Sequence, residues 1–271
     1  ANHCDAVIAP SQSIKKLLQS RGVVENIHVL PTGINLKNLQ MGKGEAFRAK
    51  WNIPTDAQVI GHLGRLSREK NLNYLIDSVI QALSKQPEAH ALIVGDGKDR
   101  NTLEQACRNA GEINKRIHFT GILRGQDKAD AYAAMDLFAF SSQSETQGLV
   151  LGEAMATGTP VVALHGPGVD DILRDKENGF LLESDAPSEK FAGVLIDVLE
   201  KLKQENWKTH LHAIATQTAE SLSRENCTRQ LLDIYQRIPS AHESLRSLDE
   251  WDRLTDRFQG EWELLQEKTR T

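Results

Sequence analysis

Short apolar runs alternate with amphipathic stretches along most of this chain. The clearest run, residues 58–66, predicts a strand, and after it apolar side chains recur every three or four residues at Leu72, Leu75, Ile76, Val79, Ile80 and Leu83. Further strands are expected at 91–94, 117–120, 137–141, 160–164 and 179–182, separated by helices. This alternation is typical of parallel βαβ units, so we expect one doubly wound α/β domain from about residue 56 onward.

Two segments fall outside this pattern. Residues 1–32 predict a strand at 6–9, a helix at 11–20 and a strand at 27–30, which indicates the end of a preceding α/β domain followed by a hinge. Beyond Pro239, residues 239–271 predict an amphipathic helix whose apolar stripe consists of Leu245, Leu248, Trp251, Leu254, Phe258, Trp262 and Leu265. Its other face mixes acidic and basic groups, which suits a protein surface better than an anionic membrane.

The expected organisation is therefore 1–32, 33–238 and 239–271. Because the chain opens at Ala1 and enters a strand almost at once, we expect a fragment or a processed product.

Composition narrows the class of protein. With 39% apolar and 25% charged residues, the chain can bury a core and is expected to be globular. Because its net charge is -5, we do not expect the chain to bind nucleic acid. No apolar run approaches the roughly 20 residues that span a bilayer. Three widely spaced cysteines, Cys4, Cys107 and Cys227, favour a reducing compartment, so we expect a cytoplasmic protein.

Candidate chemistry gathers where predicted strands end, because ligands of open parallel sheets bind at the carboxyl ends of the strands. The segment 64–71 carries Arg65 and Lys70 at the start of a helix, and two cations beside a helix N-terminus suit a diphosphate. The alternative for this segment is a solvated charge cluster, and for Arg68 and Glu69 we expect nothing more.

Two other loops are less specific. Gly95-Asp96-Gly97 forms a tight turn at which absent side chains allow a ligand near the backbone, but its spacing is not the dinucleotide fingerprint, so NAD is not expected. Residues 120–123 offer backbone groups that could contact a base edge.

The most informative stretch runs from Glu145 to Glu153. Gly148 near the helix start exposes backbone N–H groups to an anion, while a carboxylate just ahead of it can accept hydrogen bonds from sugar hydroxyls. Acids near a phosphate imply a ligand that also has hydroxyl groups. The alternative is that Glu145 caps the helix and Glu153 lies on the surface.

The amino-acid sequence of this stretch resembles the motif of a known family. Glu145 to Glu153, followed by Ala-Met-Ala-Thr-Gly-Thr-Pro-Val-Val, is similar to the signature of family 4 retaining glycosyltransferases of the GT-B fold. Five further motifs follow one another in the order typical of that family: Gly-Arg-Leu-Ser-Arg-Glu-Lys-Asn at 64–71, Val-Gly-Asp-Gly at 94–97, Phe-Thr-Gly at 119–121, Gly-Pro-Gly at 166–168 and Asn-Gly-Phe-Leu at 178–181. The resemblance covers about residues 5–238.

The resemblance implies a role for each matching residue. Arg65 and Lys70 would hold the diphosphate of a nucleotide-sugar, most simply a UDP-sugar, and Glu145 would face the donor sugar. Glu153 would bind the ribose hydroxyls. The remaining donor contacts would be Gly64, Gly95, Gly97, Ile122, Gln147, Gly148 and Leu149. The β-phosphate would help to deprotonate the acceptor, so neither a protein nucleophile nor a metal or other cofactor is expected.

The resemblance also implies what this chain does not contain. A GT-B enzyme has two Rossmann-like domains, and residues 33–238 would be the donor-binding half, with 1–32 a remnant of the acceptor-side domain and 239–271 the helix that crosses back to it. Without most of the N-terminal domain, this chain alone would not transfer sugar. Asp171 stands where the family usually has Glu, and His62, His90, His118 and His165 are expected to be packing or surface residues.

The resemblance implies a sugar or a membrane lipid as the acceptor, because the sequence Glu-Thr-Gln-Gly-Leu at 145–149 resembles that of enzymes that glycosylate diacylglycerol. Such an enzyme would work at the inner face of the membrane. Two alternatives stay open: a non-catalytic nucleotide-sugar-binding module that docks a partner through the 251–265 stripe, and a phosphorylase-like enzyme that holds a pyridoxal cofactor on a lysine.

Overall fold

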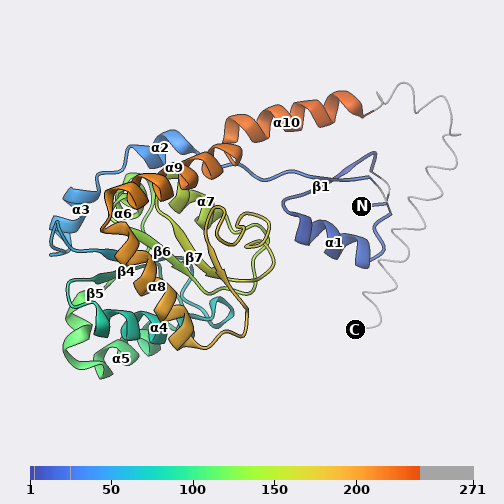
Figure 1. The fold of residues 1–271 in the computed structure, drawn as a ribbon. Helices are drawn as coiled ribbons and strands as arrows, with labels where there is room; N and C mark the ends of the chain where they lie inside the picture. The colour runs from blue at the N-terminus through green and yellow to red at the C-terminus, as the bar shows by residue number, and fades with distance from the viewer. Residues whose placement is uncertain (3, 25, 239–271) are drawn as a thin grey trace, which may run out of the picture.

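The main domain is built on a parallel sheet of six strands with helices on both faces (Figure 1). The computed structural model describes residues 1–2, 4–24 and 26–238. Within them the sheet order is β5-β4-β3-β6-β7-β8, and every pair is parallel. The strands are β3 (Val59–Leu63), β4 (His90–Val94), β5 (Ile117–Gly121), β6 (Leu137–Phe140), β7 (Val161–Leu164) and β8 (Phe180–Leu182). The predicted doubly wound α/β fold is confirmed.

The sheet buries both of its faces, which is why its strands are almost continuously apolar. Along β6, Phe138 and Phe140 pack into one core cluster, while Leu137 and Ala139 pack into the other, as the two-residue period of a strand requires. The same alternation holds along β4 and β7, and it places the two cores on opposite sides of one sheet.

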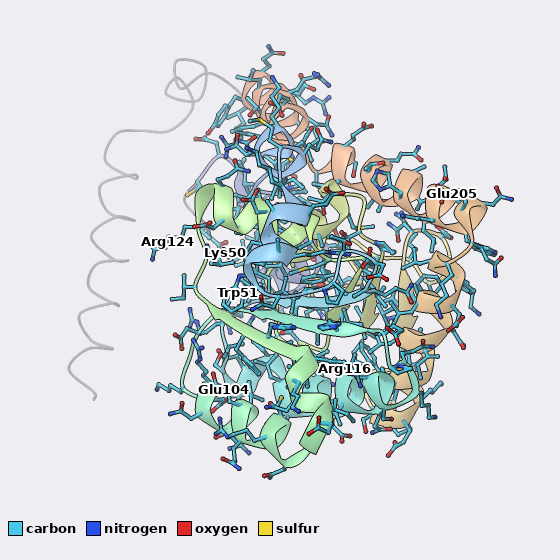
Figure 2. The ribbon with its side chains drawn as sticks, turned by 90° about the vertical axis from the view of Figure 1, so that its left-hand side faces the viewer. Lys50, Trp51, Glu104, Arg116, Arg124 and Glu205 are labelled. Carbon is cyan, nitrogen blue, oxygen red and sulfur yellow. The ribbon has the colours of Figure 1, made fainter. Side chains whose placement is uncertain are left out.

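Helices from separate parts of the sequence cover the two faces. One core is covered by α4 (Leu72–Lys85), α5 (Arg100–Asn109) and α8 (Ser188–Leu202). The other is covered by α2 (Leu36–Gln40), α3 (Gly44–Lys50), α6 (Gly125–Ala133), α7 (Leu149–Ala156) and α9 (Glu205–Ser221). Figure 2 shows the two layers edge-on, with Lys50 and Trp51 near the end of α3 on one side of the sheet and Glu104 of α5 on the other.

Most predicted elements agree with the structure to within a few residues, and four helices were not predicted. These are α2, α3, α9 and α10 (Arg224–Arg237). Helix α2 has only five residues, and α9 buries only Ala215 and Ala219, so neither carries a broad apolar stripe in the sequence. Short or weakly apolar helices of this kind are held mainly by tertiary packing.

A second, smaller unit of secondary structure lies within residues 1–32. Strands β1 (Val7–Ala9) and β2 (Ile27–Val29) pair in parallel as a separate two-stranded sheet, connected by α1 (Gln12–Ser20). Figure 1 shows this unit beside the main domain, with α10 extending toward it.

Gly33 follows this unit, has a positive φ of 85° and lies against the start of α10. A Cβ atom there would lie 2.9 Å from the Arg224 Cα, so only glycine fits the turn without strain. The divisions at residues 32 and 238 stay predictions. The amphipathic helix predicted for 239–271 lies outside the described residues, and among the described helices none is both long and apolar enough to cross a membrane.

Candidate active site

The candidate site lies where the order of strands reverses. The chain runs from β3 outward to β4 and β5 and then returns to β6 on the other side of β3. Strands β3 and β6 are direct neighbours, with Ile60 opposite Leu137 and Gly61 opposite Phe138. Because the connections leave in opposite directions here, a crevice opens at the carboxyl ends of these two strands, where doubly wound folds bind ligands.

A buried serine fastens the two loops that leave this point. Ser141, directly after β6, is fully buried, and its Oγ atom lies 3.0 Å from the backbone oxygens of both Lys70 and Asn71. Asn71 has a left-handed φ of 53° and ends the 3-10 turn Arg68–Lys70 before α4 begins. The Lys70 backbone is therefore held against the loop of β6.

Two of the predicted catalytic side chains meet across these loops. Lys70 Nζ donates to Glu145 Oε1 at 2.6 Å and to the Ser144 backbone oxygen at 3.3 Å. The side chains of Lys70 and Glu145 are only 20% and 16% exposed, so water screens their attraction less than at an open surface. The sequence predicted that both residues face one ligand, and the structure brings them into contact.

Arg65 lies at the rim of the same site. It is exposed, and with Gly64, Lys70, Glu145 and Val150 it lines a pocket of about 330 Å³. Glu69 also lines it; a hydrogen bond from Ser67 Oγ lowers the Glu69 pKa, and the nearby charges of Arg65 and Lys70 lower it further. The pocket thus contains two cations and two carboxylates.

His62 closes the floor of the pocket. It is 1% exposed and its ring packs against those of both Phe138 and Phe140, in agreement with the prediction of a packing histidine. Burial is the main reason that its pKa falls to about 4, so the ring is neutral at neutral pH. Nδ1 lies 3.1 Å from the Ala139 carbonyl oxygen and must donate to it, which leaves Nε2 as a buried acceptor without a protein partner in the described chain.

The glycines of the β4 loop are explained by packing between loops. Gly95 has a φ of 139°, and a Cβ atom on it would overlap the Gly64 backbone oxygen. A Cβ atom on Gly97 would overlap the Leu66 oxygen. The missing side chains therefore let the β3 and β4 loops touch, and a contact of either glycine with a ligand stays a prediction. Ile122, after β5, is 63% exposed and available to a ligand.

The turn into α7 is tightly built. Gly148 adopts a left-handed φ of 69° directly before the helix, and a Cβ atom there would lie 3.0 Å from the Gly168 oxygen. Gln147 is 5% exposed, and its Oε1 accepts hydrogen bonds from Thr32 N at 3.1 Å and Thr32 Oγ1 at 2.8 Å. Leu149 packs against the core. The Gln147 side chain therefore contacts residue 32, which the sequence did not indicate.

Glu153 lies apart from the Lys70 pocket. Lys128 Nζ donates to its Oε1 at 2.6 Å, and Tyr132 Oη donates to its Oε2 at 2.9 Å. Tyr132 is fully buried, and burial together with the Glu153 charge raises its pKa well above the usual value. Sequence reasoning missed Lys128 and Tyr132, because no local spacing links α6 to α7. The surface alternative for Glu153 is wrong, since its side chain is 19% exposed.

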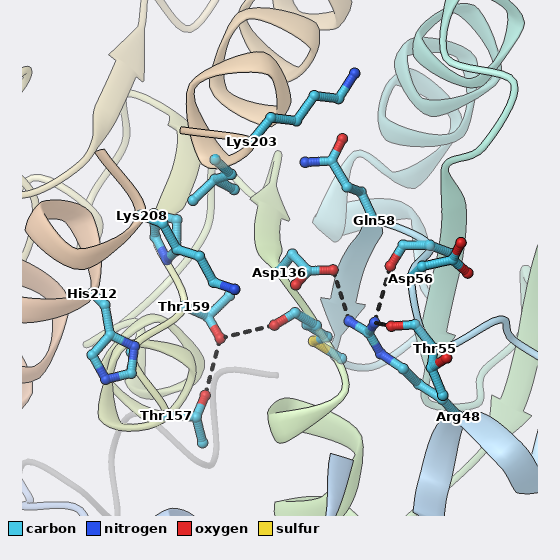
Figure 3. Close-up of a pocket in the computed structure, with 15 residues that line it drawn as sticks. Arg48, Thr55, Asp56, Gln58, Asp136, Thr157, Thr159, Lys203, Lys208 and His212 are labelled. Atoms are coloured by element: carbon cyan, nitrogen blue, oxygen red, sulfur yellow. Dashed lines mark hydrogen bonds and ion pairs between the residues drawn. The ribbon is translucent and has the colours of Figure 1, made fainter. Parts of the chain in front are cut away.

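A second cavity, of about 390 Å³, lies at the opposite edge of the sheet, where β3, β6 and β7 begin (Figure 3). Its most buried cation is Arg48, whose guanidinium donates to the backbone oxygens of Thr55, Ala57 and Ala134 and to Asp136 Oδ2. Arg48 is thus fully used inside the protein. We therefore assign the candidate chemistry to the Lys70 pocket at the carboxyl ends of the strands.

The described residues contain no cluster of three or more His, Cys, Asp or Glu side chains that could hold a metal ion. Asp171, where the resemblance leads one to expect Glu, reaches residues of α1.

Comparison with known proteins identifies relatives of this chain. The family model described as "Glycosyl transferases group 1" matches residues 43–210. The chain is 31% identical over 200 residues to alpha-monoglucosyldiacylglycerol synthase of Streptococcus pneumoniae, which covers 72% of this chain and 44% of that protein. It is also 31% identical over 210 residues to a GDP-mannose-dependent alpha-mannosyltransferase of Mycobacterium tuberculosis, covering 77% of this chain and 51% of that protein.

Among known structures, Anabaena Alr3699/HepE in complex with UDP superposes with a TM-score of 0.75 at 26% identity, covering 87% of this chain and 65% of that one. The chain spans about half the length of the two curated relatives.

Proposed function

Because the chain belongs to the group 1 glycosyl transferase family, we propose that residues 33–238 bind a nucleotide-diphosphate sugar and supply the donor half of a retaining hexosyltransferase of the family 4 type. The other half would come from an acceptor-side domain, of which residues 1–32 are the last units. On this proposal the chain alone binds donor but does not turn it over.

The observation that carries the proposal is the 2.6 Å contact between Lys70 and Glu145 at the switch point between β3 and β6. A diphosphate that enters between Arg65 and Lys70 gains two cations, and the sugar attached to it extends toward the carboxylate of Glu145. Hydroxyl groups of the sugar donate to that carboxylate, so a single ligand satisfies both members of the ion pair.

The chemical step follows from these contacts. The bond between the anomeric carbon and the diphosphate oxygen breaks, and a bond from that carbon to the acceptor oxygen forms on the same face. The acceptor's proton passes to the departing diphosphate. Arg65 and Lys70 stabilise the negative charge that develops on the leaving group, and loss of one such contact typically lowers the rate by roughly 10² to 10³.

The ribose would be bound by Glu153. Its two carboxylate oxygens are already oriented by Lys128 at 2.6 Å and Tyr132 at 2.9 Å, so the carboxylate is fixed before the nucleotide arrives. Each carboxylate oxygen can accept more than one hydrogen bond, which leaves acceptor capacity for ribose hydroxyls. Ile122 and the glycine turn at 95–97 would border the base.

We propose a UDP-sugar as the donor and a lipid or glycan as the acceptor, with action at the cytoplasmic face of a membrane. The Anabaena structure was obtained with UDP, and the pneumococcal relative is named for a diacylglycerol lipid. The mycobacterial relative is named for GDP-mannose, so the base must be tested directly.

The test is calorimetric titration of this chain with UDP and with GDP. We expect saturable binding of UDP, which Lys70→Ala weakens by about 1–3 kcal/mol as a charge-assisted contact is lost. Lys85→Ala, at the exposed end of α4, removes the same charge far from the pocket and should leave affinity unchanged. Equal affinity in all three proteins would place the nucleotide elsewhere.

A further inference from the structure

The strongest unassigned feature is a cluster of hydrogen bonds between α1 and the loops around Glu145. Asp171, which follows the Gly166-Pro167-Gly168 turn, reaches across to the first residues of α1. One of its carboxylate oxygens accepts from Gln12 N at 2.7 Å, and the other accepts from Ser13 Oγ at 2.6 Å and Ser13 N at 3.4 Å. The carboxylate therefore binds the amide groups that a helix N-terminus leaves without intrahelical partners.

A serine next to these residues contacts the Glu145 loop directly. Ser11 is 2% exposed and caps α1, with its Oγ accepting from Ile14 N at 3.2 Å. The same Oγ donates to the Thr146 backbone oxygen at 2.6 Å. Since Thr32 binds the side chain of Gln147, both residues that follow Glu145 are held by residues of the 1–32 unit.

Gly168 connects Asp171 to Glu145 by a second route. Its amide donates to Asp171 Oδ2 at 3.3 Å. A Cβ atom on Gly168, which has a φ of 76°, would lie 2.9 Å from the Glu145 Cβ and 3.1 Å from Gln147 N. The turn bound by Asp171 is therefore in van der Waals contact with the backbone that carries Glu145.

We infer that Asp171 is a positioning residue for Glu145: by holding the N-terminus of α1 and the Gly168 amide at once, it fixes the 144–148 loop in the conformation that receives the donor sugar. This rests on the proposed function. These contacts link the geometry of the sugar-facing carboxylate to the position of residues 11–13 and 32.

The first test is hydrogen exchange on the complete 271-residue chain. In Asp171→Asn, amide exchange in peptides covering residues 10–15 and 143–149 should be about tenfold faster, since exchange rates follow the free energy of local opening and a charge-assisted contact is weakened. Asp197→Asn is the matched control. It removes the same charge at an exposed position of α8, away from both segments, and should leave both peptides unchanged.

The second test compares UDP with UDP-glucose. Asp171→Asn should weaken binding of UDP-glucose roughly tenfold and of UDP less than about threefold, because on the proposed function the sugar is the part of the donor that faces Glu145. Asp171→Glu keeps the charge and should recover most of the affinity for UDP-glucose. If Asp171 only stabilised the fold, its loss would not selectively lower the extra affinity that the sugar gives.

The inference is overturned when Asp171→Asn leaves exchange of 143–149 at the wild-type rate, or when it weakens UDP and UDP-glucose equally. A wild-type chain that binds neither nucleotide contradicts the proposed function instead, and the exchange experiment alone then decides whether Asp171 fixes the loop.

Discussion

Lys70 Nζ and Glu145 Oε1 lie 2.6 Å apart, although 75 residues separate them in the chain. They meet because β3 and β6 are neighbours in the sheet and the loops after both strands leave from the same edge. On the proposed function, the carboxylate of Glu145 and a diphosphate compete for the same cation, Lys70.

This competition predicts opposite effects on two ligands. Glu145→Gln should bind UDP as tightly as the wild-type chain or up to about tenfold more tightly, because Lys70 loses a competing charge. The same variant should lose the additional affinity that the sugar gives UDP-glucose. Calorimetry with both ligands measures the difference, and a large loss of UDP affinity in Glu145→Gln would contradict the assigned orientation.

The hydrogen bond from Tyr132 to Glu153 predicts an effect on the stability of the folded chain. Tyr132→Phe leaves a partly buried carboxylate oxygen without its hydroxyl donor, so we expect a loss of about 1–2 kcal/mol in the free energy of unfolding. Tyr74→Phe removes a hydroxyl whose bond to the Pro187 oxygen is 3.4 Å long and exposed, and it should cost less than about 0.5 kcal/mol. Urea unfolding of both variants checks this, and equal losses would argue against a special role for Tyr132.

Gly95 and Gly111 both have a positive φ, but alanine should have different effects on stability at the two positions. Gly95→Ala should destabilise the protein by more than about 2 kcal/mol or prevent folding, because its Cβ would overlap the Gly64 oxygen. Gly111→Ala, with a φ of 64° and no atom within 4 Å of the new Cβ, should cost only about 1 kcal/mol of conformational strain. Thermal unfolding of the two variants measures both values, and similar costs would mean that the loops can separate freely.

His62 predicts a pH dependence of stability. Its pKa is about 4 in the folded chain and 6.5 when unperturbed, so between these values the unfolded chain binds more protons. Stability from this residue is therefore complete above pH 6.5 and falls as the pH drops toward 4, by roughly 3 kcal/mol in total.

Urea unfolding at several pH values should show this slope in the wild-type chain and a shallower one in His62→Gln. Parallel curves would show that His62 ionises normally in the folded protein.

The sequence predicted the framework of the site better than its contacts. The βαβ alternation was enough to place Arg65, Lys70 and Glu145 at strand ends, because parallel strands put their carboxyl ends on one edge. The Lys128 contact with Glu153 depends on how α6 packs against α7, and the Asp171 contact joins α1 to a loop 158 residues away. Such pairings follow from the three-dimensional arrangement and have no local pattern that could reveal them.

A crystal structure of this chain with UDP-glucose bound would show directly which residues hold the donor. We expect the diphosphate between Arg65 and Lys70 at the carboxyl ends of β3 and β6, the glucose beside Glu145 and the ribose at Glu153. A diphosphate bound at the opposite edge of the sheet, in the cavity beside Arg48, or contacts that bypass Lys70 and Glu145 altogether, would contradict this expectation.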